Sequence, residues 1–414
     1  MDFDIHFSDE DEQFRREVRT WLEENVPQNI EWPVDPYDLT PEHTKIKEDI
    51  RHKLGAKGWF APDVPKEYGG GGLSDEKVSV LQQEFNRIEK KYHVTGVFRF
   101  IFDVMALPIL RHGNEWLKQE IATAIYSGKV TSWLNETEPE HGTDNAAIET
   151  TAILDGDDYV LNGTKIYVGR DDPLDWREAW LFTPAITEPS GARHENMGVF
   201  AVPANSPGIE VEVLPLIGAE AKKHILYFRN CRVPAKYLIG GREARGWDVL
   251  QTSLRSEHGG GGRIVPPETL TSEVIHYCKA HKRNGKPLSS DPDIQDILVE
   301  LWIEDQKERV YTLGTWWTGK SGKWTGKQYK AVQTNLHRKL RSPKLAKALL
   351  KVLGPYAVTG DKDLRVLMGK VERAERMGCV THIAGTPEAL KIMMSRGTGV
   401  TVPKGQPGRK EEAH

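Results

Sequence analysis

Hydrophobic residues in the first third of the chain recur at the three- and four-residue spacing of amphipathic helices. The first predicted helix begins at Ser8, with Asp11 in the capping-box position, and Pro27 ends it. Thr40 followed by Pro41 opens a second helix, and Ser74 can cap a third. Further helical patterns cover residues 104–111 and 115–126. We therefore expect residues 1–131 to form an N-terminal helical domain.

From Ser132 the hydrophobic period changes to two, which indicates β-strands. The dipeptides Asp155–Gly156 and Asn162–Gly163 are typical of tight turns between such strands. Strands are predicted at 148–154, 159–168, 198–203, 209–214, 224–228 and 231–234. These segments predict a compact central β domain over residues 132–240.

After Gly240 the helical period returns, with helices predicted at 293–310, 345–353 and 364–376. We expect a C-terminal helical bundle over residues 241–400 and a mobile, charged tail at 401–414. The predicted fold is thus mainly α with a β insert, without βαβ alternation.

Composition and charge narrow the functional classes. The formal net charge of -4 argues against a dedicated nucleic-acid binder, and no apolar run is long enough to span a membrane. The acidic start of the chain leads directly into a helix pattern, so we expect no signal peptide. Cys231, Cys278 and Cys379 lie far apart without metal-site spacing, which indicates reduced thiols and a cytoplasmic protein.

Common nucleotide, metal and hydrolase motifs are absent from the sequence. There is no G-x-G-x-x-G after a strand, no G-x-x-x-x-G-K-[ST], no His-rich metal spacing and no G-x-S-x-G. The glycine runs 69–72 and 259–262 lack a following Lys-Ser/Thr, so we interpret them as flexible or tightly packed loops. A dinucleotide, if bound, is not held in the Rossmann manner.

The stretch from Thr137 to Asp144 is a candidate binding loop. Thr137 and Thr143 supply hydroxyl groups, Pro139 fixes φ, and Gly142 allows a ligand to approach the backbone closely. Asp144 can accept hydrogen bonds from the amides of the loop itself. By itself this pattern also describes an ordinary ordered turn.

From about residue 7 to residue 400 the chain resembles the acyl-CoA dehydrogenases. The resemblance rests on segments that occur in the family's order, among them FSDEDEQFRREVRTWLEENVP, LGAKGWFAPDVPKEYGGGGLS, NETEPEHGTD, DYVLNGTKIYV, FRNCRVPAKYLIGG and HIAGTPEALKIMMSRGTG. It implies a helical N-terminal domain, a small β domain and a C-terminal four-helix bundle. It also implies FAD between the β domain and the bundle, in contact with a neighbouring subunit.

The implied reaction is the α,β-dehydrogenation of an acyl-CoA thioester. A carboxylate removes the α proton, and the β carbon passes a hydride to flavin N5. The implied partners are the acyl-CoA substrate, an electron-transfer flavoprotein or another electron acceptor, and further subunits in a homo- or hetero-oligomer, either a dimer or a tetramer. No metal is implied.

Several residues match the flavin contacts of the family. Thr137 corresponds to the threonine of the T-E-P loop, and Thr143 retains a hydroxyl where serine is usual, so it is also a candidate substrate contact. Tyr167 stands where a tryptophan is usual, and Gly169 where a threonine bonds flavin N5. The remaining cofactor positions implied by the resemblance are Asn135, Gly142, His281, Lys282, Thr386 and Glu388. His281 and Lys282 replace an arginine that reaches the FAD pyrophosphate.

The catalytic base is assigned by the same comparison. Many members carry a glutamate before the G-T turn, but here that position is Ala384, which cannot take a proton. Another branch, which resembles actinobacterial dehydrogenases of bulky or steroid side-chain acyl-CoA, keeps its base at the start of a bundle helix. Glu257 aligns with that base, with Arg255 and His258 as candidate substrate contacts. The alternative is that Glu257 is only a helix-start carboxylate favoured by the helix dipole.

Departures from the family pattern leave three hypotheses. Gly259–Gly262 and Pro266–Pro267 should break or delay the helix, which fits either a pocket widened for a bulky acyl group or a decayed site. The run 351–355 lacks the glutamine and second glycine that serve a neighbour's FAD. The chain is therefore an acyl-CoA dehydrogenase with Glu257 as base, a catalytically silent partner subunit, or a flavin enzyme of other chemistry on the same scaffold.

Overall fold

The computed structural model describes residues 7–33, 38–92, 104–169, 178–218, 222–242, 245–259, 269–320, 329–359, 364, 366–379 and 385–400. It divides into two compact units. The first comprises Met1–Glu257 and Leu353–Val380, and the second comprises His258–Val352 and Thr381–His414. Ala384 and the predicted mobile tail lie outside the described residues, and the predicted three-domain division stays a prediction.

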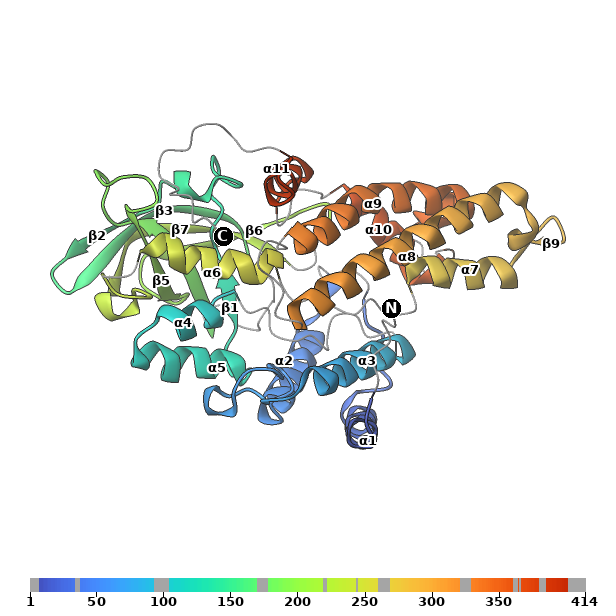
Figure 1. The fold of residues 1–414 in the computed structure, drawn as a ribbon, viewed down its shortest axis with the longest axis horizontal. Coiled ribbons are helices and arrows are strands. Elements are labelled where there is room, and N and C mark those ends of the chain that lie inside the picture. Colours follow the sequence, from blue (N-terminus) through green and yellow to red (C-terminus); the bar gives the residue numbers. More distant parts are fainter. Residues whose placement is uncertain are drawn as a thin grey trace. The chain divides into compact units, whose positions relative to one another are not determined.

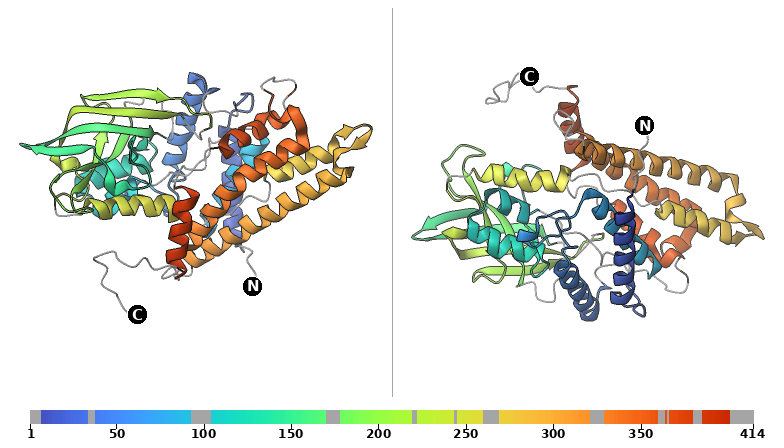
Figure 2. Two further views of the ribbon diagram at one scale, coloured as in Figure 1. Left: turned by 90° about the horizontal axis from the view of Figure 1, so that it is seen from above. Right: turned by 60° about the horizontal axis from the view of Figure 1, so that its bottom comes forward.

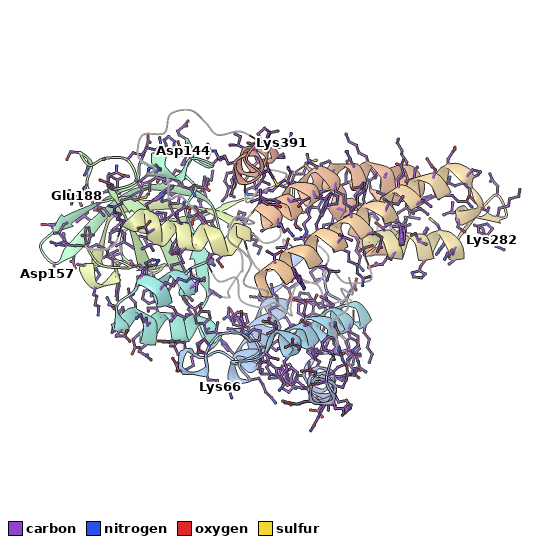
Figure 3. All side chains as sticks on the ribbon, in the orientation of Figure 1. Lys66, Asp144, Asp157, Glu188, Lys282 and Lys391 are labelled. Atoms are coloured by element: carbon purple, nitrogen blue, oxygen red, sulfur yellow. The ribbon has the colours of Figure 1, made fainter. Side chains whose placement is uncertain are left out.

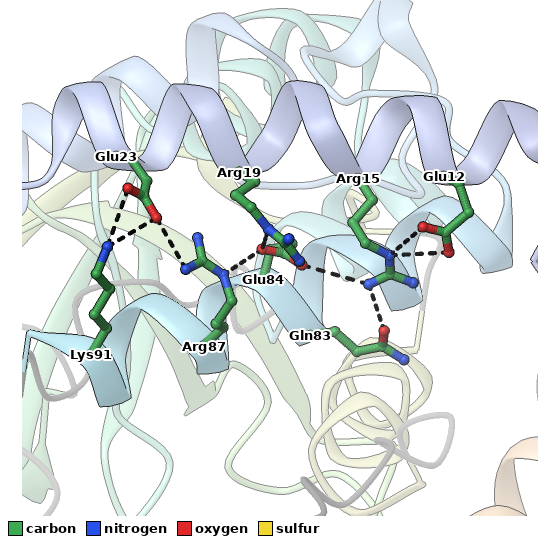
Figure 4. Close-up of polar contacts among 8 residues, drawn as sticks. All are labelled: Glu12, Arg15, Arg19, Glu23, Gln83, Glu84, Arg87 and Lys91. Carbon is green, nitrogen blue, oxygen red and sulfur yellow. Dashed lines mark hydrogen bonds and ion pairs between the residues drawn. The ribbon is translucent and has the colours of Figure 1, made fainter.

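The N-terminal helices begin where the capping residues predict. They are α1 (Asp9–Asn25), α2 (Pro41–Ala56) and α3 (Asp75–Lys91), with a short 3-10 turn η2 (Lys66–Tyr68) between the last two. Ser8 and Asp11 form the predicted capping box, since the Asp11 N–H donates to Ser8 Oγ at 3.2 Å and the Ser8 N–H donates to Asp11 at 2.9 Å. Helix α1 packs on α3 through a row of charged residues around Glu84 (Figure 4).

The central sheet has seven strands. They are β1 (Ser132–Leu134), β2 (Thr151–Asp155), β3 (Asp158–Val168), β4 (Trp180–Ile186), β5 (Met197–Pro203), β6 (Ile209–Leu214) and β7 (Lys223–Pro234). Their order is β1-β4-β2-β3-β7-β6, with β5 paired to β4. The sequence missed β1 and β4 and divided β7 into two strands.

Helices cover one face of this sheet (Figure 1). They are α4 (Ala106–His112), the π-helical segment η3 (Leu117–Ala122), α5 (Thr123–Tyr126) and α6 (Gly246–Gly259). Their apolar side chains share one core with the sheet, formed among others by Ile109, Ile121, Phe182, Val199, Ala201, Val249 and Leu250. Short 3-10 turns η4 (Asn145–Ala147), η6 (Ala235–Tyr237), η8 (Gly354–Ala357) and η9 (Val366–Gly369), with helix α10 (Lys370–Gly378), belong to the same unit.

The second unit is built on two long antiparallel helices, α8 (Pro292–Lys320) and α9 (Tyr329–Leu353), which Figures 1 and 2 show side by side. Arg338 of α9 donates to Glu308 of α8 at 2.6 Å. The unit also contains α7 (Leu270–Ala280), the hairpin β8 (Lys282–Arg283) and β9 (Lys286–Pro287), the turn η7 (Leu288–Ser290) and α11 (Pro387–Gly397).

The predicted helix–strand–helix order is confirmed, and the chain is mainly α with a β insert. The predicted interruption after Glu257 agrees with the end of α6 at Gly259 and the start of α7 at Leu270, although residues 260–268 lie outside the described part. Of the helices in the described segments, none combines the length and apolar character needed to cross a membrane.

Candidate flavin site

The loop after β1 is a tight turn held against β3. Backbone hydrogen bonds of 2.8 and 3.2 Å join Glu138 and His141 in both directions across the turn. The Ile166 N–H of β3 donates to the carbonyl oxygen of Thr137 at 2.9 Å. Gly142 is exposed, and a β-carbon there would meet only Thr137 Cγ2, at 3.8 Å. The loop therefore presents Thr137 half-buried and leaves the space above Gly142 open.

Tyr167 lies next to this loop in an unusual backbone conformation. Between the pairs Lys165–Leu226 and Val168–His224 the β3–β7 register shifts, because Ile166 and Tyr167 face a single residue of β7. Tyr167 has φ of 61°, and its side chain is 42% exposed. A large side chain at positive φ is uncommon and is retained mainly at functional positions. The bulge thus places an exposed aromatic ring beside the hydroxyl-bearing loop.

Gly169, two residues after Tyr167, also has an unusual backbone conformation. Its φ is +94°, and a β-carbon would lie 3.0 Å from His224 Nδ1. His224 is fixed in turn by stacking on Trp133, with ring centroids 4.8 Å apart. The carbonyl oxygen of Gly169 accepts a hydrogen bond from Lys223 Nζ. A glycine cannot supply the side-chain contact of the family's threonine, and the backbone conformation here would strain any larger residue.

Asn135 is almost fully buried at the base of the loop, and Thr143 is exposed at its far end. Asn135 Nδ2 donates to Thr183 Oγ1 at 3.0 Å, whereas its Oδ1 has no hydrogen-bond partner among the described residues. Asp144, labelled in Figure 3, forms an ion pair with Arg193 in addition to a hydrogen bond from the Ala146 amide of the loop. The ion pair is the larger cause of the lowered pKa of Asp144.

A buried ion pair beneath the loop was not predicted. Lys165 Nζ donates to Glu138 Oε1 at 2.8 Å, and both side chains are at most 4% exposed. Burial lowers the pKa of Lys165, and the Glu138 carboxylate opposes this shift. Burial raises the pKa of Glu138, but Lys165 and hydrogen bonds from Thr150 and Glu149 outweigh it, so the net pKa of Glu138 is lowered. Lys165 alternates in phase with the buried residues Tyr159 and Leu161 of β3, a signal that could have revealed the burial of Lys165 but not its partner.

The candidate base Glu257 lies near the C-terminal end of its helix, whereas the N-terminal end was expected. Arg255, Glu257 and His258 lie in the last five residues of α6, which begins at Gly246. The expected position at a helix start is therefore wrong for Glu257, and the favourable N-terminal dipole cannot be its reason for being there. The side chains of these three residues lie outside the described part of the chain.

The remaining predicted cofactor residues belong to the second unit. His281 is the C-cap residue of α7; its Nδ1 donates to the Tyr277 carbonyl oxygen at 2.9 Å, and its ring stacks on the Tyr277 ring. Lys282 is exposed at the β8–β9 hairpin (Figure 3). Thr386 caps α11 by accepting from the Ala389 N–H at 3.1 Å, and Glu388 is exposed in the first turn of that helix. Among the residues the structure describes, no group of three or more His, Cys, Asp or Glu could hold a metal ion.

Family models match almost the whole chain. The N-terminal, middle and C-terminal domain models of acyl-CoA dehydrogenase match residues 8–129, 134–231 and 244–397. The chain belongs to the acyl-CoA dehydrogenase family. The resemblance drawn from the sequence is thus confirmed, as are the family fold and the oxidoreductase class. Acyl-CoA dehydrogenases are FAD-dependent, so FAD is the cofactor of this family.

Individual relatives and solved structures match this chain over nearly its whole length. Acyl-CoA dehydrogenase FadE29 of Mycobacterium tuberculosis is 24% identical over 410 residues, covering 97% of this chain and 99% of the relative. Among solved structures, the ChsE4–ChsE5 complex of Mycobacterium tuberculosis has a TM-score of 0.76 at 21% identity, covering 96% of this chain and 99% of that one. The Tcur3481–Tcur3483 steroid ACAD has a TM-score of 0.76 at 23% identity, covering 98% of this chain and 100% of that one. These structural likenesses show the fold.

The residues of the first unit fit a flat ring with polar edges, such as the flavin of FAD. Tyr167 offers an exposed aromatic face, and Thr137 and Thr143 offer hydroxyl groups from one loop. Gly142 leaves room for close approach, because a β-carbon at that position would touch only a methyl group. The loop therefore offers donor groups and open space that fit a flavin ring.

Proposed function

We propose that this protein catalyses the FAD-dependent α,β-dehydrogenation of an acyl-CoA thioester. The observation that carries the proposal is the hydroxyl-bearing loop at Thr137 and Gly142, set beside the strained and exposed Tyr167. Membership of the acyl-CoA dehydrogenase family supports the reaction class.

In this proposal the residues of the chain have distinct roles. Thr137 and Thr143 donate hydrogen bonds to the cofactor, Tyr167 packs against its ring, and Thr143 also faces the substrate. When bound, FAD supplies the oxidising equivalent as the acceptor of a hydride from the β carbon. Further cofactor contacts are proposed for Asn135, Gly142, His281, Lys282, Thr386 and Glu388, while Gly169 contributes only its backbone.

Glu257 removes the α proton of the thioester. The chain offers Ala384 at the alternative position of the base, and an alanine cannot accept a proton. A carboxylate serves because burial with the substrate raises its pKa toward the working pH. Arg255 and His258, on either side of Glu257 in the sequence, are proposed to contact the thioester or the acyl group.

We propose a bulky acyl group, such as a steroid side chain, as the substrate. The support is twofold: the Gly- and Pro-rich residues after Glu257 limit the length of α6, and a similar structure is a steroid ACAD. An electron-transfer flavoprotein or another acceptor would reoxidise the cofactor.

The test is the visible spectrum of the purified protein during anaerobic titration with a panel of short, long and steroid acyl-CoA thioesters. We expect a flavin band that bleaches with a bulky thioester. The variant Glu257→Gln should keep the band and lose bleaching by about 100-fold or more in rate. Glu300→Gln, which changes an exposed carboxylate of α8, is the matched control and should bleach normally. A band that no thioester bleaches would instead support other flavin chemistry.

A second candidate function is that of a catalytically silent partner subunit, and one feature of α8 favours it. Five large apolar side chains of α8 are 43–58% exposed, namely Val299, Trp302, Ile303, Val310 and Trp317. Exposed apolar surface of this kind typically marks a protein interface. The heteromeric ChsE4–ChsE5 complex offers a comparison. This alternative would be established if the purified protein is colourless and gains flavin only when it is co-expressed with a related chain, and if Trp302→Glu no longer co-purifies with that chain.

A further inference from the structure

We propose that Lys165 and Glu138 are positioning residues that hold the loop of residues 137–150 in the conformation that receives the flavin. This inference rests on the proposed function, because the loop carries Thr137 and Thr143. The pair lies directly beneath the candidate site, yet neither residue reaches the exposed surface of the loop.

Lys165 connects two strands to the loop. Its side chain is fully buried, and Nζ donates to Glu138 Oε1 and to the Pro184 carbonyl oxygen of β4, both at 2.8 Å. Because Lys165 is part of β3, one ammonium group joins β3, β4 and the loop. A buried ammonium without such acceptors would be strongly destabilising, so these contacts fix the position of Glu138.

Glu138 closes the other end of the loop. Its carboxylate accepts from the Glu149 N–H at 2.5 Å and from the Thr150 N–H at 3.0 Å. Residues 138 and 149–150 are thereby held together, and the intervening residues form a closed loop. Hydrogen bonds to an ionised acceptor are stronger than those between neutral groups, so this closure depends on the charge of Glu138.

The location of the pair favours a positioning role over a purely structural one. A buried ion pair generally stabilises a fold no more than an apolar pair of the same volume, whereas loss of one partner is strongly destabilising. Glu138 is adjacent to Thr137, and Lys165 lies two residues before Tyr167. A shift of either partner would therefore move a group proposed to contact the flavin.

The experiment compares Lys165→Met, the double variant Lys165→Met/Glu138→Gln and the control Lys53→Met. Lys53 is 43% exposed and pairs with Asp49 at 2.8 Å on α2, so its loss removes a lysine ion pair far from the loop in sequence. Two quantities are measured: the dissociation constant and absorption spectrum of bound flavin, and hydrogen–deuterium exchange of the peptide covering residues 138–150 in flavin-free protein.

We expect Lys165→Met to weaken flavin binding by about tenfold or more, because Glu138 is left as an unpaired buried charge. The double variant removes both charges, so it should be less impaired than Lys165→Met, a coupling expected of residues in contact. It should still bind flavin several-fold more weakly than the wild type, with a shifted flavin spectrum and faster exchange over 138–150. Lys53→Met should match the wild type in both measurements.

A double variant with wild-type flavin affinity, spectrum and exchange would overturn the inference, even if Lys165→Met does not fold. Failure of the proposed function has a different signature. If the wild type binds no flavin, exchange over residues 138–150 in flavin-free protein still shows whether the pair orders the loop.

Discussion

Gly169 and His224 lie so close that a β-carbon on Gly169 would stand 3.0 Å from His224 Nδ1. The stack of His224 on Trp133 leaves the imidazole little room to move away. The position where the family usually places a hydroxyl-bearing threonine is therefore strained for any side chain, both by backbone conformation and by the contact with His224. In the proposed flavin site, the contacts must therefore come from other groups of the loop.

Gly169→Thr should therefore destabilise the protein instead of restoring a family contact. We expect the free energy of unfolding to fall by about 1–3 kcal/mol, because φ of +94° is strained for a β-branched residue. Urea unfolding measures this change. Gly314→Ala in α8 is the control, since a β-carbon there meets nothing within 4 Å, and it should be neutral or stabilising by up to about 1 kcal/mol. Tighter flavin binding by Gly169→Thr would contradict the prediction.

The capped helices and alternating strands could be predicted from the sequence, but β4 could not. Six of the seven residues of β4 are buried, so both faces lack the polar positions that reveal a period of two. Strand β7 was divided in two because exposed Arg229 and Asn230, the latter at φ of 49°, interrupt its alternation. Burial on both faces and local irregularity thus remove the signal on which strand prediction depends.

The candidate site was predictable in its surface groups and not in its support. Hydroxyls and glycine in the loop after β1 are visible as residue types, and Tyr167 by its match to the family. The Glu138–Lys165 pair depends on a contact between residues 27 positions apart, which no local pattern contains. A short run around Glu257 likewise did not show that α6 begins at Gly246, well before it.

Glu84 should contribute to stability in a pH-dependent way. It is 2% exposed and accepts from Arg19 at 2.7 Å and Arg87 at 2.7 Å (Figure 4). Burial raises the pKa of Glu84, but the two arginines outweigh burial and lower it below 4.5. The ionised form then stabilises the fold above about pH 4.5, and this stabilisation is lost as the pH falls through the lowered pKa.

Glu84→Gln should accordingly lower the free energy of unfolding by about 1–3 kcal/mol at neutral pH, since a buried charged acceptor is replaced by a neutral one. The deficit should shrink as the pH falls through the lowered pKa of Glu84, because the wild type then also loses the charge. Urea unfolding at several pH values measures both effects. Glu23→Gln removes a more exposed partner of Arg87 and should lower the free energy of unfolding by less than Glu84→Gln does. A deficit that is constant from neutral to acidic pH would show that packing, and not charge, is lost.

The three cysteines should differ sharply in reactivity. Cys231 and Cys278 are buried, and burial raises the pKa of the Cys231 thiol to about 11, whereas Cys379 is exposed. Since the thiolate is the reactive form, iodoacetamide should modify only Cys379 in the native protein and all three thiols in denaturant. Mass spectrometry of the intact protein counts the labels. Cys379→Ser should abolish rapid native labelling, and rapid modification of Cys231 would show that its part of the sheet opens.

Tyr167 should show opposite effects on stability and flavin binding. Asparagine adopts positive φ more readily than tyrosine, so Tyr167→Asn relieves strain at φ of 61°. We expect the free energy of unfolding to be unchanged or raised by up to about 1 kcal/mol, while the flavin dissociation constant rises about tenfold because the aromatic face is lost. Tyr167→Phe keeps both the ring and the strain, and it should bind flavin as the wild type does. Urea unfolding and fluorescence titration with FAD measure the two quantities. A less stable Tyr167→Asn with undiminished flavin affinity would mean that the bulge in β3 serves the sheet and that the flavin ring lies elsewhere.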